Sequence, residues 1–129
     1  MRILLDTQCW LWMNAAPDRF SSSTRRLIET PETTLFLSSA SALEIAIKYA
    51  LGKLQLPGRP SAYVPSRLAQ TKAIALPISH EHALRSGELP VHHRDPFDRL
   101  LIAQAQLERL PLLTSDRALA AYDADFIWA

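Results

Sequence analysis

The sequence is poor in the residues on which several protein classes depend. It has one cysteine and three glycines. A lone cysteine forms no intrachain disulfide, so Cys9, which lies among apolar residues, is expected to be a small buried hydrophobic side chain in a reducing cytoplasm. The chain also lacks a glycine-rich phosphate loop and a glycine-flanked nucleophilic serine. These absences argue against a disulfide scaffold, a P-loop enzyme and a serine hydrolase.

Strong net charge and long apolar runs are missing as well. The formal net charge is +1, so any contact with a polyanion must come from a local patch. The apolar run Arg2–Leu5 is broken by Asp6, which leaves no signal-peptide core, and no run is long enough to span a membrane. We therefore expect one soluble cytoplasmic domain over residues 1–129, without a membrane partner.

What is present is an alternation of strand-like and helix-like segments. Five runs have the apolar or β-branched character of strands, at residues 2–5, 33–37, 72–76, 111–114 and 125–128. The segments between them carry apolar residues at helical spacing, with caps at Thr7, Ser21–Ser23, Ser79 and Asp95 and a helix near 62–70. This alternation predicts a three-layer α/β/α sandwich with a mainly parallel sheet.

Four acids stand where strands end or helices begin. Asp6 follows the first strand, Asp116 follows the fourth, and Asp98 is the third residue of a helix that Asp95 would cap. Glu44 would form a capping box with Ser41, in a helix that stops at Gly52. Because ligands of parallel α/β folds gather beyond the carboxyl ends of the strands, the four acids are expected at one edge.

Clustered carboxylates need a compensating charge. Two like charges about 4 Å apart repel by roughly 4 kcal/mol at an effective dielectric near 20, and a helix N-terminus recovers only about 0.3–1 kcal/mol. A divalent cation would balance them, and oxygen ligands favour Mg²⁺ or Mn²⁺ and hence phosphodiester hydrolysis. Simpler interpretations stay open, since Asp95 and Asp98 could be a capping pair and Glu44 could pair with Lys48 on the helix surface.

The histidines do not have the spacing of a structural zinc site. The chain has His80, His82, His92 and His93, and none has a partner pattern with cysteine. We expect all four at the surface rather than as metal ligands. His92, His93 and Arg94 precede the acid-rich helix start, so a supporting contact to a substrate phosphate is open to them.

Four blocks of the sequence resemble a known family. They are LLDT at 4–7, SSASALEIAIKYALGKLQLP at 38–57, HRDPFDRLLIAQA at 93–105 and LLTSD at 112–116. Together, in this order, they resemble the PIN-domain ribonucleases, and most closely the VapC toxins of bacterial type II toxin–antitoxin pairs. The resemblance implies a PIN-like fold and an endoribonuclease that depends on Mg²⁺ or Mn²⁺. It also implies a homodimer and inhibition by a cognate antitoxin protein.

The resemblance also assigns roles to residues. Asp6 and Asp98 would be the principal metal ligands, and Glu44 and Asp116 would complete the acidic pocket directly or through water. Asp95 and Thr114 would support them. Gln8 and Ala42 depart from the family pattern, in which histidine and a bulky aromatic residue are common at these positions. Neither departure removes an acid, so they bear on substrate fit or packing.

Other functions remain to be weighed against an RNase toxin. For the toxin, Arg94, Arg99 and Arg117, with Lys48, are candidate contacts to RNA phosphates. The alternative is a catalytically inactive PIN domain whose helix with Trp10 and Trp12 docks another chain, although these tryptophans also suit a core. A phosphotransfer domain that uses Asp6 as acceptor lacks the second aspartate expected beside it.

Overall fold

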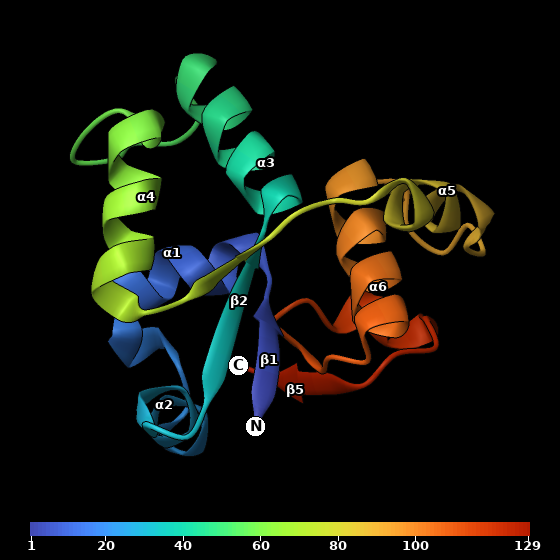
Figure 1. Cartoon of the computed structure of the whole chain (residues 1–129), viewed down its shortest axis with the longest axis horizontal. Helices are drawn as coiled ribbons and strands as arrows, with labels where there is room; N and C mark the ends of the chain where they lie inside the picture. Colours follow the sequence, from blue (N-terminus) through green and yellow to red (C-terminus); the bar gives the residue numbers. More distant parts are fainter.

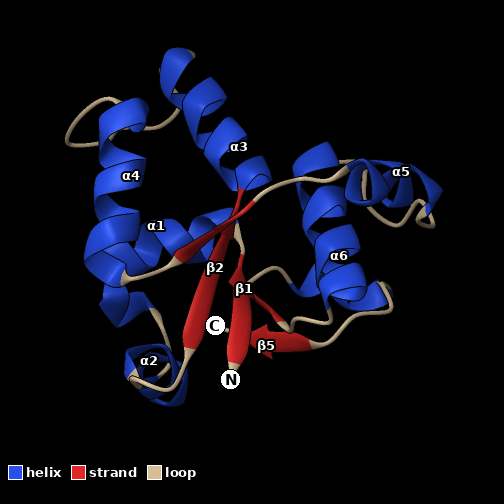
Figure 2. Ribbon diagram, viewed as in Figure 1, coloured by secondary structure: helices blue, strands red, loops and turns tan.

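A five-stranded parallel sheet forms the centre of the molecule (Figures 1 and 2). The computed structural model describes residues 1–129. The strands are β1 (Arg2–Leu5), β2 (Thr34–Ser38), β3 (Ile74–Leu76), β4 (Leu112–Thr114) and β5 (Phe126–Trp128). Their order is β3-β2-β1-β4-β5, and every neighbouring pair is parallel. The expected three-layer sandwich with a parallel sheet is confirmed.

Helices follow most of the strands and cover the sheet. They are α1 (Thr7–Ala15), α2 (Ser22–Glu29), α3 (Ser39–Ala50), α4 (Pro60–Thr71), α5 (His80–Glu88) and α6 (Pro96–Glu108), with short 3₁₀ helices η1 (Pro17–Arg19) and η2 (Arg117–Ala121). None of them combines the length and the apolar character that a membrane-spanning helix needs. The 3₁₀ turn η1 was not expected from the sequence.

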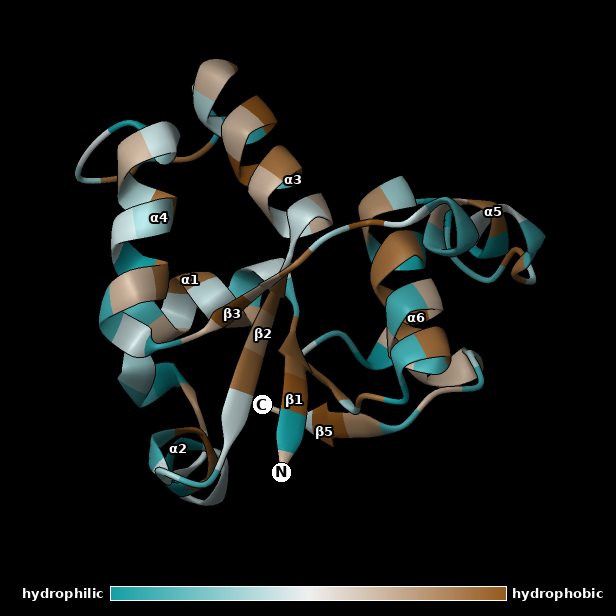
Figure 3. Cartoon of the chain, in the orientation of Figure 1, coloured by the Kyte–Doolittle hydropathy of each residue, from teal (hydrophilic) through white to brown (hydrophobic).

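The core is divided by the sheet into two apolar clusters. Alternate side chains of β1 point to opposite faces, with Ile3 and Leu5 in one cluster and Leu4 in the other. The apolar colour of β1 and β2 in Figure 3 reflects this burial on both faces. Cys9 and Trp10 are fully buried in the cluster with Ile3, so the interpretation of Cys9 as a buried hydrophobic side chain is confirmed.

Two helix starts differ from those expected. Asp6, not Thr7, caps α1, because the Asp6 Oδ1 atom accepts the Cys9 N–H at 2.7 Å. The helix α3 begins at Ser39 with Ser38 as its cap, so the capping box of Ser41 and Glu44 is wrong. The strand β2 passes directly into α3, because Ser38, the last residue of β2, is also the N-cap of α3. Glu44 therefore lies in the second turn of α3.

The histidine expectation is wrong for His82, which is only 3% exposed. Its Nδ1 atom accepts the Ser79 N–H at 3.0 Å and completes a capping box at the start of α5. The Nε2 atom lies 2.8 Å from a Glu108 carboxylate oxygen. These two partners satisfy the ring in place of water.

The order of the strands determines where a cleft can form. The chain places β2 and β3 on one side of β1, then returns to add β4 on the other side. At such a reversal the connections diverge and leave a crevice beyond the strand ends. Asp6 directly follows β1, and its N–H donates to the Leu113 carbonyl of β4 at 3.0 Å. Asp6 and the β4 terminus at Thr114 are therefore neighbours at this crevice.

Candidate active site

A cleft of about 340 Å³ opens at this strand reversal, and its lining brings the predicted acids together. It is lined by Asp6, Glu44, Asp95, Asp98 and Asp116, together with Lys48 and Lys53. These acids come from segments far apart in the sequence, as the strand-end argument predicted. A larger hollow of about 730 Å³ beside α5 and α6 contains none of them.

Asp6 is held rigidly at the end of β1. It is 7% exposed, and it receives hydrogen bonds from the Cys9 N–H and the Thr114 side chain. Burial raises the pKa of Asp6 above its usual value, and the charge of Glu44 raises it further, while the bonds from Thr114 and Cys9 lower it. Asp6 is therefore a preorganised carboxylate that lacks a compensating positive charge.

Glu44 is also buried, but it has two partners. Its Oε1 atom accepts the Thr7 hydroxyl hydrogen at 2.7 Å, and Oε2 forms an ion pair with Lys48. The expected pair of Glu44 and Lys48 is thus present. The hydrogen bond to Glu44 raises the pKa of Lys48, and the charges of Glu44, Asp95 and Asp98 also raise it, against an opposing effect of burial. Lys48 therefore remains a cation at the rim of the cleft.

Asp98 has the most perturbed carboxyl group of the cleft. Burial and the nearby charge of Asp95 raise its pKa to about 6, although a hydrogen bond and the charge of His93 oppose the rise. Asp95 caps α6 as predicted, since its Oδ1 atom accepts the Phe97 N–H at 2.9 Å. Burial and the charge of Asp95 thus make the ionisation of Asp98 more costly.

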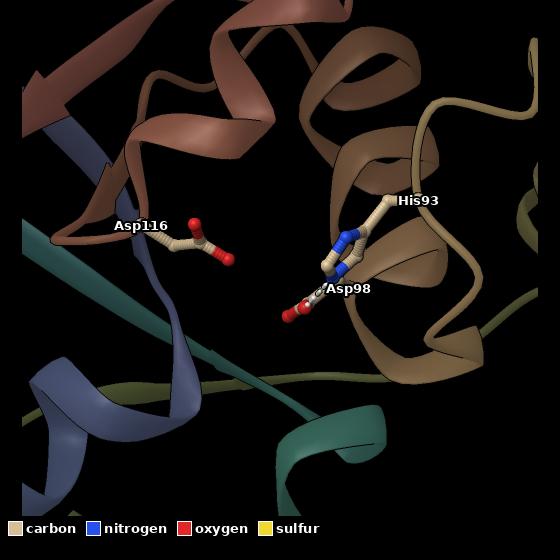
Figure 4. Close-up of side chains that lie close together, drawn as sticks. All are labelled: His93, Asp98 and Asp116. Atoms are coloured by element: carbon tan, nitrogen blue, oxygen red, sulfur yellow. Dashed lines mark hydrogen bonds and ion pairs between the residues drawn. The ribbon is translucent and has the colours of Figure 1, made fainter.

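Asp116 faces Asp98 from the opposite wall of the cleft. Its Oδ1 atom accepts the Ala118 N–H at 3.0 Å, and its own N–H donates to Thr114 Oγ1 at 3.0 Å. One ligand atom each from Asp116, Asp98 and His93 lie within 4.8 Å of one another, and Figure 4 shows the three side chains converging. The sequence indicated a surface position for His93 and did not place it beside Asp116, although its position five residues before Asp98 was a usable signal.

The arginines are used differently from the expectation. Arg99 was a candidate phosphate contact, but its guanidinium lies within 3.3 Å of four backbone carbonyls and is absent from the cleft lining. We therefore withdraw Arg99 as an RNA contact. Arg117 stacks over Trp128 at 4.3 Å, and Arg94 is exposed and makes no hydrogen bond or ion pair. Lys53, which follows Gly52 at the end of α3, is a cleft residue that sequence reasoning missed.

The donor set of the cleft fits a hard divalent cation. Five carboxylates face two lysines, and the two carboxyl groups with raised pKa values, Asp6 and Asp98, have burial as the largest cause. A cation would favour their ionised forms and would balance the excess negative charge. The geometry could hold such an ion between the end of β1, the start of α6 and the loop after β4.

Comparison with known proteins is consistent with this architecture. A family model described as PIN domain matches residues 3–125. Over 61 residues the chain is 39% identical to Ribonuclease VapC16 of Mycobacterium tuberculosis, a match that covers 47% of this chain and 43% of that protein. The matched region thus spans less than half of this chain and less than half of the ribonuclease.

Solved structures share the fold over nearly the full length. VapBC2 of Rickettsia felis, bound to a promoter DNA fragment, aligns with a TM-score of 0.73 at 18% identity, covering 100% of this chain and 99% of that one. DNA-bound VapBC of Salmonella typhimurium aligns with a TM-score of 0.68 at 17% identity, covering 98% and 97%. At these identities the likeness shows the fold alone.

Proposed function

The chain belongs to the PIN domain family, and from this premise we propose that it is a metal-dependent endoribonuclease, the toxin of a toxin–antitoxin pair. The observation that carries the proposal is the convergence of Asp6, Glu44, Asp98 and Asp116 on one cleft. Acids gathered in this way suit the binding of a cation and, with it, the hydrolysis of a phosphodiester. The partial match to a protein named as a ribonuclease supports RNA as the substrate.

The proposed cofactor is Mg²⁺ or Mn²⁺. Asp6 and Asp98 would be the principal ligands, with Glu44 and Asp116 acting directly or through water. When bound, the ion lowers the pKa of a coordinated water and neutralises charge on the phosphate. Asp95 would add negative potential from the α6 N-terminus.

The remaining side chains of the site would position the acids and the substrate. Thr114 and the Cys9 N–H fix Asp6, and Thr7 fixes Glu44. Lys48 and Lys53 at the cleft would attract the RNA backbone, a contact that carries no sequence preference. Arg94 and Arg117 remain candidates for phosphate contacts outside the cleft lining.

The alternative of an inactive docking module has less support. Trp10, one of the two tryptophans offered for docking, is fully buried, and Trp12 is half-buried with an edge-to-face contact to Phe20. The burial of Trp10 confirms its assignment to the core and removes half of the proposed docking face. Because α1 buries Trp10 in the core of the domain, that side chain is not available for contact with another protein.

We propose a cognate antitoxin and a second copy of the chain as partners. The solved structures that share this fold include VapBC2 of Rickettsia felis and a toxin–antitoxin complex from Klebsiella pneumoniae. Exposed apolar side chains on α3 and at its C-cap, among them Leu43, Ile47 and Leu51, support the presence of a protein-binding surface.

The nuclease proposal is tested with purified protein and a labelled structured RNA. Cleavage should require Mg²⁺ or Mn²⁺, stop with chelator, and fall by more than about 100-fold in Asp6→Asn and Asp98→Asn. Glu32→Gln, an exposed acid outside the cleft, is the matched control. Cleavage at the wild-type rate by both aspartate variants would refute the proposal, and a DNA strand of the same sequence tests the preference for RNA.

A further inference from the structure

His93 lies behind the cleft lining, next to two of the acids that line it, Asp98 and Asp116. Its Nε2 atom is 2.8 Å from Asp98 Oδ2, and its side chain is 27% exposed. A nitrogen of His93 and one oxygen each of Asp98 and Asp116 lie within 4.8 Å of one another (Figure 4). No other histidine belongs to this group.

We propose that His93 supplies an imidazole nitrogen to the metal ion and forms its coordination set with Asp98 and Asp116. This inference rests on the proposed function, because it concerns the same ion. It replaces an all-oxygen site with a mixed one and makes His93 a ligand, where the sequence suggested a surface residue. Asp6 would remain a ligand from the end of β1, and Glu44 would act through water.

The spacing of the donor atoms fits this role. Two ligands at adjacent corners of an octahedron, each about 2.1 Å from the ion, lie roughly 3 Å apart. The 2.8 Å between His93 Nε2 and Asp98 Oδ2 is a hydrogen bond in the metal-free protein, and it holds the two atoms near this separation, so that an ion could replace the proton between them. Asp116 comes from the loop after β4 and His93 from the loop before α6, so the donors reach this group from different segments of the chain.

The segment that carries His93 is held in place by the rest of the fold. The His93 N–H donates to the Tyr122 hydroxyl at 2.8 Å, and the Arg99 guanidinium reaches the His93 carbonyl at 3.3 Å. The same guanidinium binds the carbonyls of Ser86, Leu89 and Pro90, which precede His93 in the chain. A backbone fixed in this way limits the positions open to the imidazole, as a ligand requires.

The proposal has a consequence for the choice of ion. Carboxylate and water oxygens suit Mg²⁺, whereas imidazole nitrogen favours first-row transition ions. A mixed site should therefore bind Mn²⁺ more tightly than Mg²⁺. Loss of the imidazole should reduce the affinity for Mn²⁺ more than the affinity for Mg²⁺.

Pulsed electron paramagnetic resonance of the Mn²⁺-loaded protein tests this directly. The wild-type protein should show modulation from a coordinated ¹⁴N nucleus, which should disappear in His93→Gln and persist in His92→Gln. His92 is the matched control because it is the exposed neighbour of His93 and is outside the cluster. Calorimetry should show Mn²⁺ affinity lower by about 10-fold to 100-fold in His93→Gln.

The outcomes separate this inference from the nuclease proposal. Mn²⁺ binding without nitrogen modulation in the wild-type protein, or modulation that persists in His93→Gln, would overturn the role of His93 while leaving the nuclease proposal intact. Cleavage that survives Asp6→Asn and Asp98→Asn would refute the nuclease proposal instead. If His93→Gln does not fold, wild-type protein grown with ¹⁵N-histidine decides the question, because the ¹⁴N signal should become a ¹⁵N signal.

Discussion

Thr7 donates its hydroxyl hydrogen to Glu44 Oε1 across 2.7 Å, although the two residues are 37 positions apart in the chain. The first residue of α1 thus holds a carboxylate in the second turn of α3. Ser41 Oγ lies 2.9 Å from the same hydroxyl, so three polar side chains share this buried contact between the helices. The contact gives the cleft a rigid wall.

Replacing Thr7 with valine removes that donor while keeping the shape of the side chain. The free energy of unfolding should fall by about 1–3 kcal/mol, because a buried carboxylate oxygen loses its partner. Urea denaturation at neutral pH measures the change. Thr34→Val is the control, since Thr34 lies in β2 and its hydroxyl makes no hydrogen bond. Equal stability of the two variants would contradict a structural role for the contact.

Asp98→Asn should stabilise the metal-free protein at pH 7.5. The pKa of Asp98 is about 6 in the folded state against 3.8 in the unfolded state, so the folded protein binds more protons between these values. The contribution of Asp98 to the free energy of unfolding is therefore complete below about pH 4, and it is lost as the pH rises through 6. The variant should gain up to about 3 kcal/mol at pH 7.5 and little near pH 4.

Denaturation in chelator at both pH values measures this gain, with Glu32→Gln as the exposed control. A gain of the same size at pH 4 and pH 7.5 would show that ionisation of Asp98 is not its cause.

Affinity for Mn²⁺ should depend on pH below about 6. The ion binds the ionised carboxylate, and a proton on Asp98 competes with it once the pH falls below that pKa. The association constant should approach a drop of about tenfold per pH unit there, because one proton on Asp98 competes with the ion. Calorimetry between pH 5 and pH 7.5 gives the slope. A flat profile would contradict binding at Asp98.

Arg99→Lys tests whether this arginine maintains the fold of the loop before α6. Lysine has one ammonium and cannot reproduce the planar fork that reaches four carbonyls, so the free energy of unfolding should fall by about 2 kcal/mol. Amide hydrogen exchange should become faster in residues 86–95. Arg94→Lys, at an exposed position without a hydrogen bond, should change neither quantity. A reduced affinity for RNA with unchanged stability and exchange would instead restore Arg99 as a phosphate contact.

The convergence of the acids on one cleft could be predicted because it depends only on strand ends and helix starts. Asp6 directly follows the first strand and Asp116 comes two residues after the end of β4, and parallel strands bring their carboxyl ends to one edge. Asp95 followed by Pro96 is typical of a helix start, because aspartate caps the first turn and proline is tolerated at the first helical position. At each of these positions, the local sequence preference and the folded structure agree on where the strand ends or the helix begins.

Other features depended on contacts that the sequence does not encode locally. The serines of SSASA offer several caps of equal quality, and only the length of β2 decides that Ser38 is used. Arg99 has the same charge whether it meets a phosphate or backbone carbonyls, and the loop that supplies those carbonyls forms only in the folded chain. His93 likewise comes to lie beside Asp98 and Asp116 through the path of that loop.

The position of β4 beside β1 has a consequence for how the protein is made. Leu4 pairs with Leu112, so the first strand receives one of its two neighbours only after most of the polypeptide has left the ribosome. Closing such a long loop is slow relative to local helix formation. During synthesis, Asp6 is therefore present long before Asp116 joins it, and a nascent chain that stops short of β4 lacks the complete set of acids that lines the cleft.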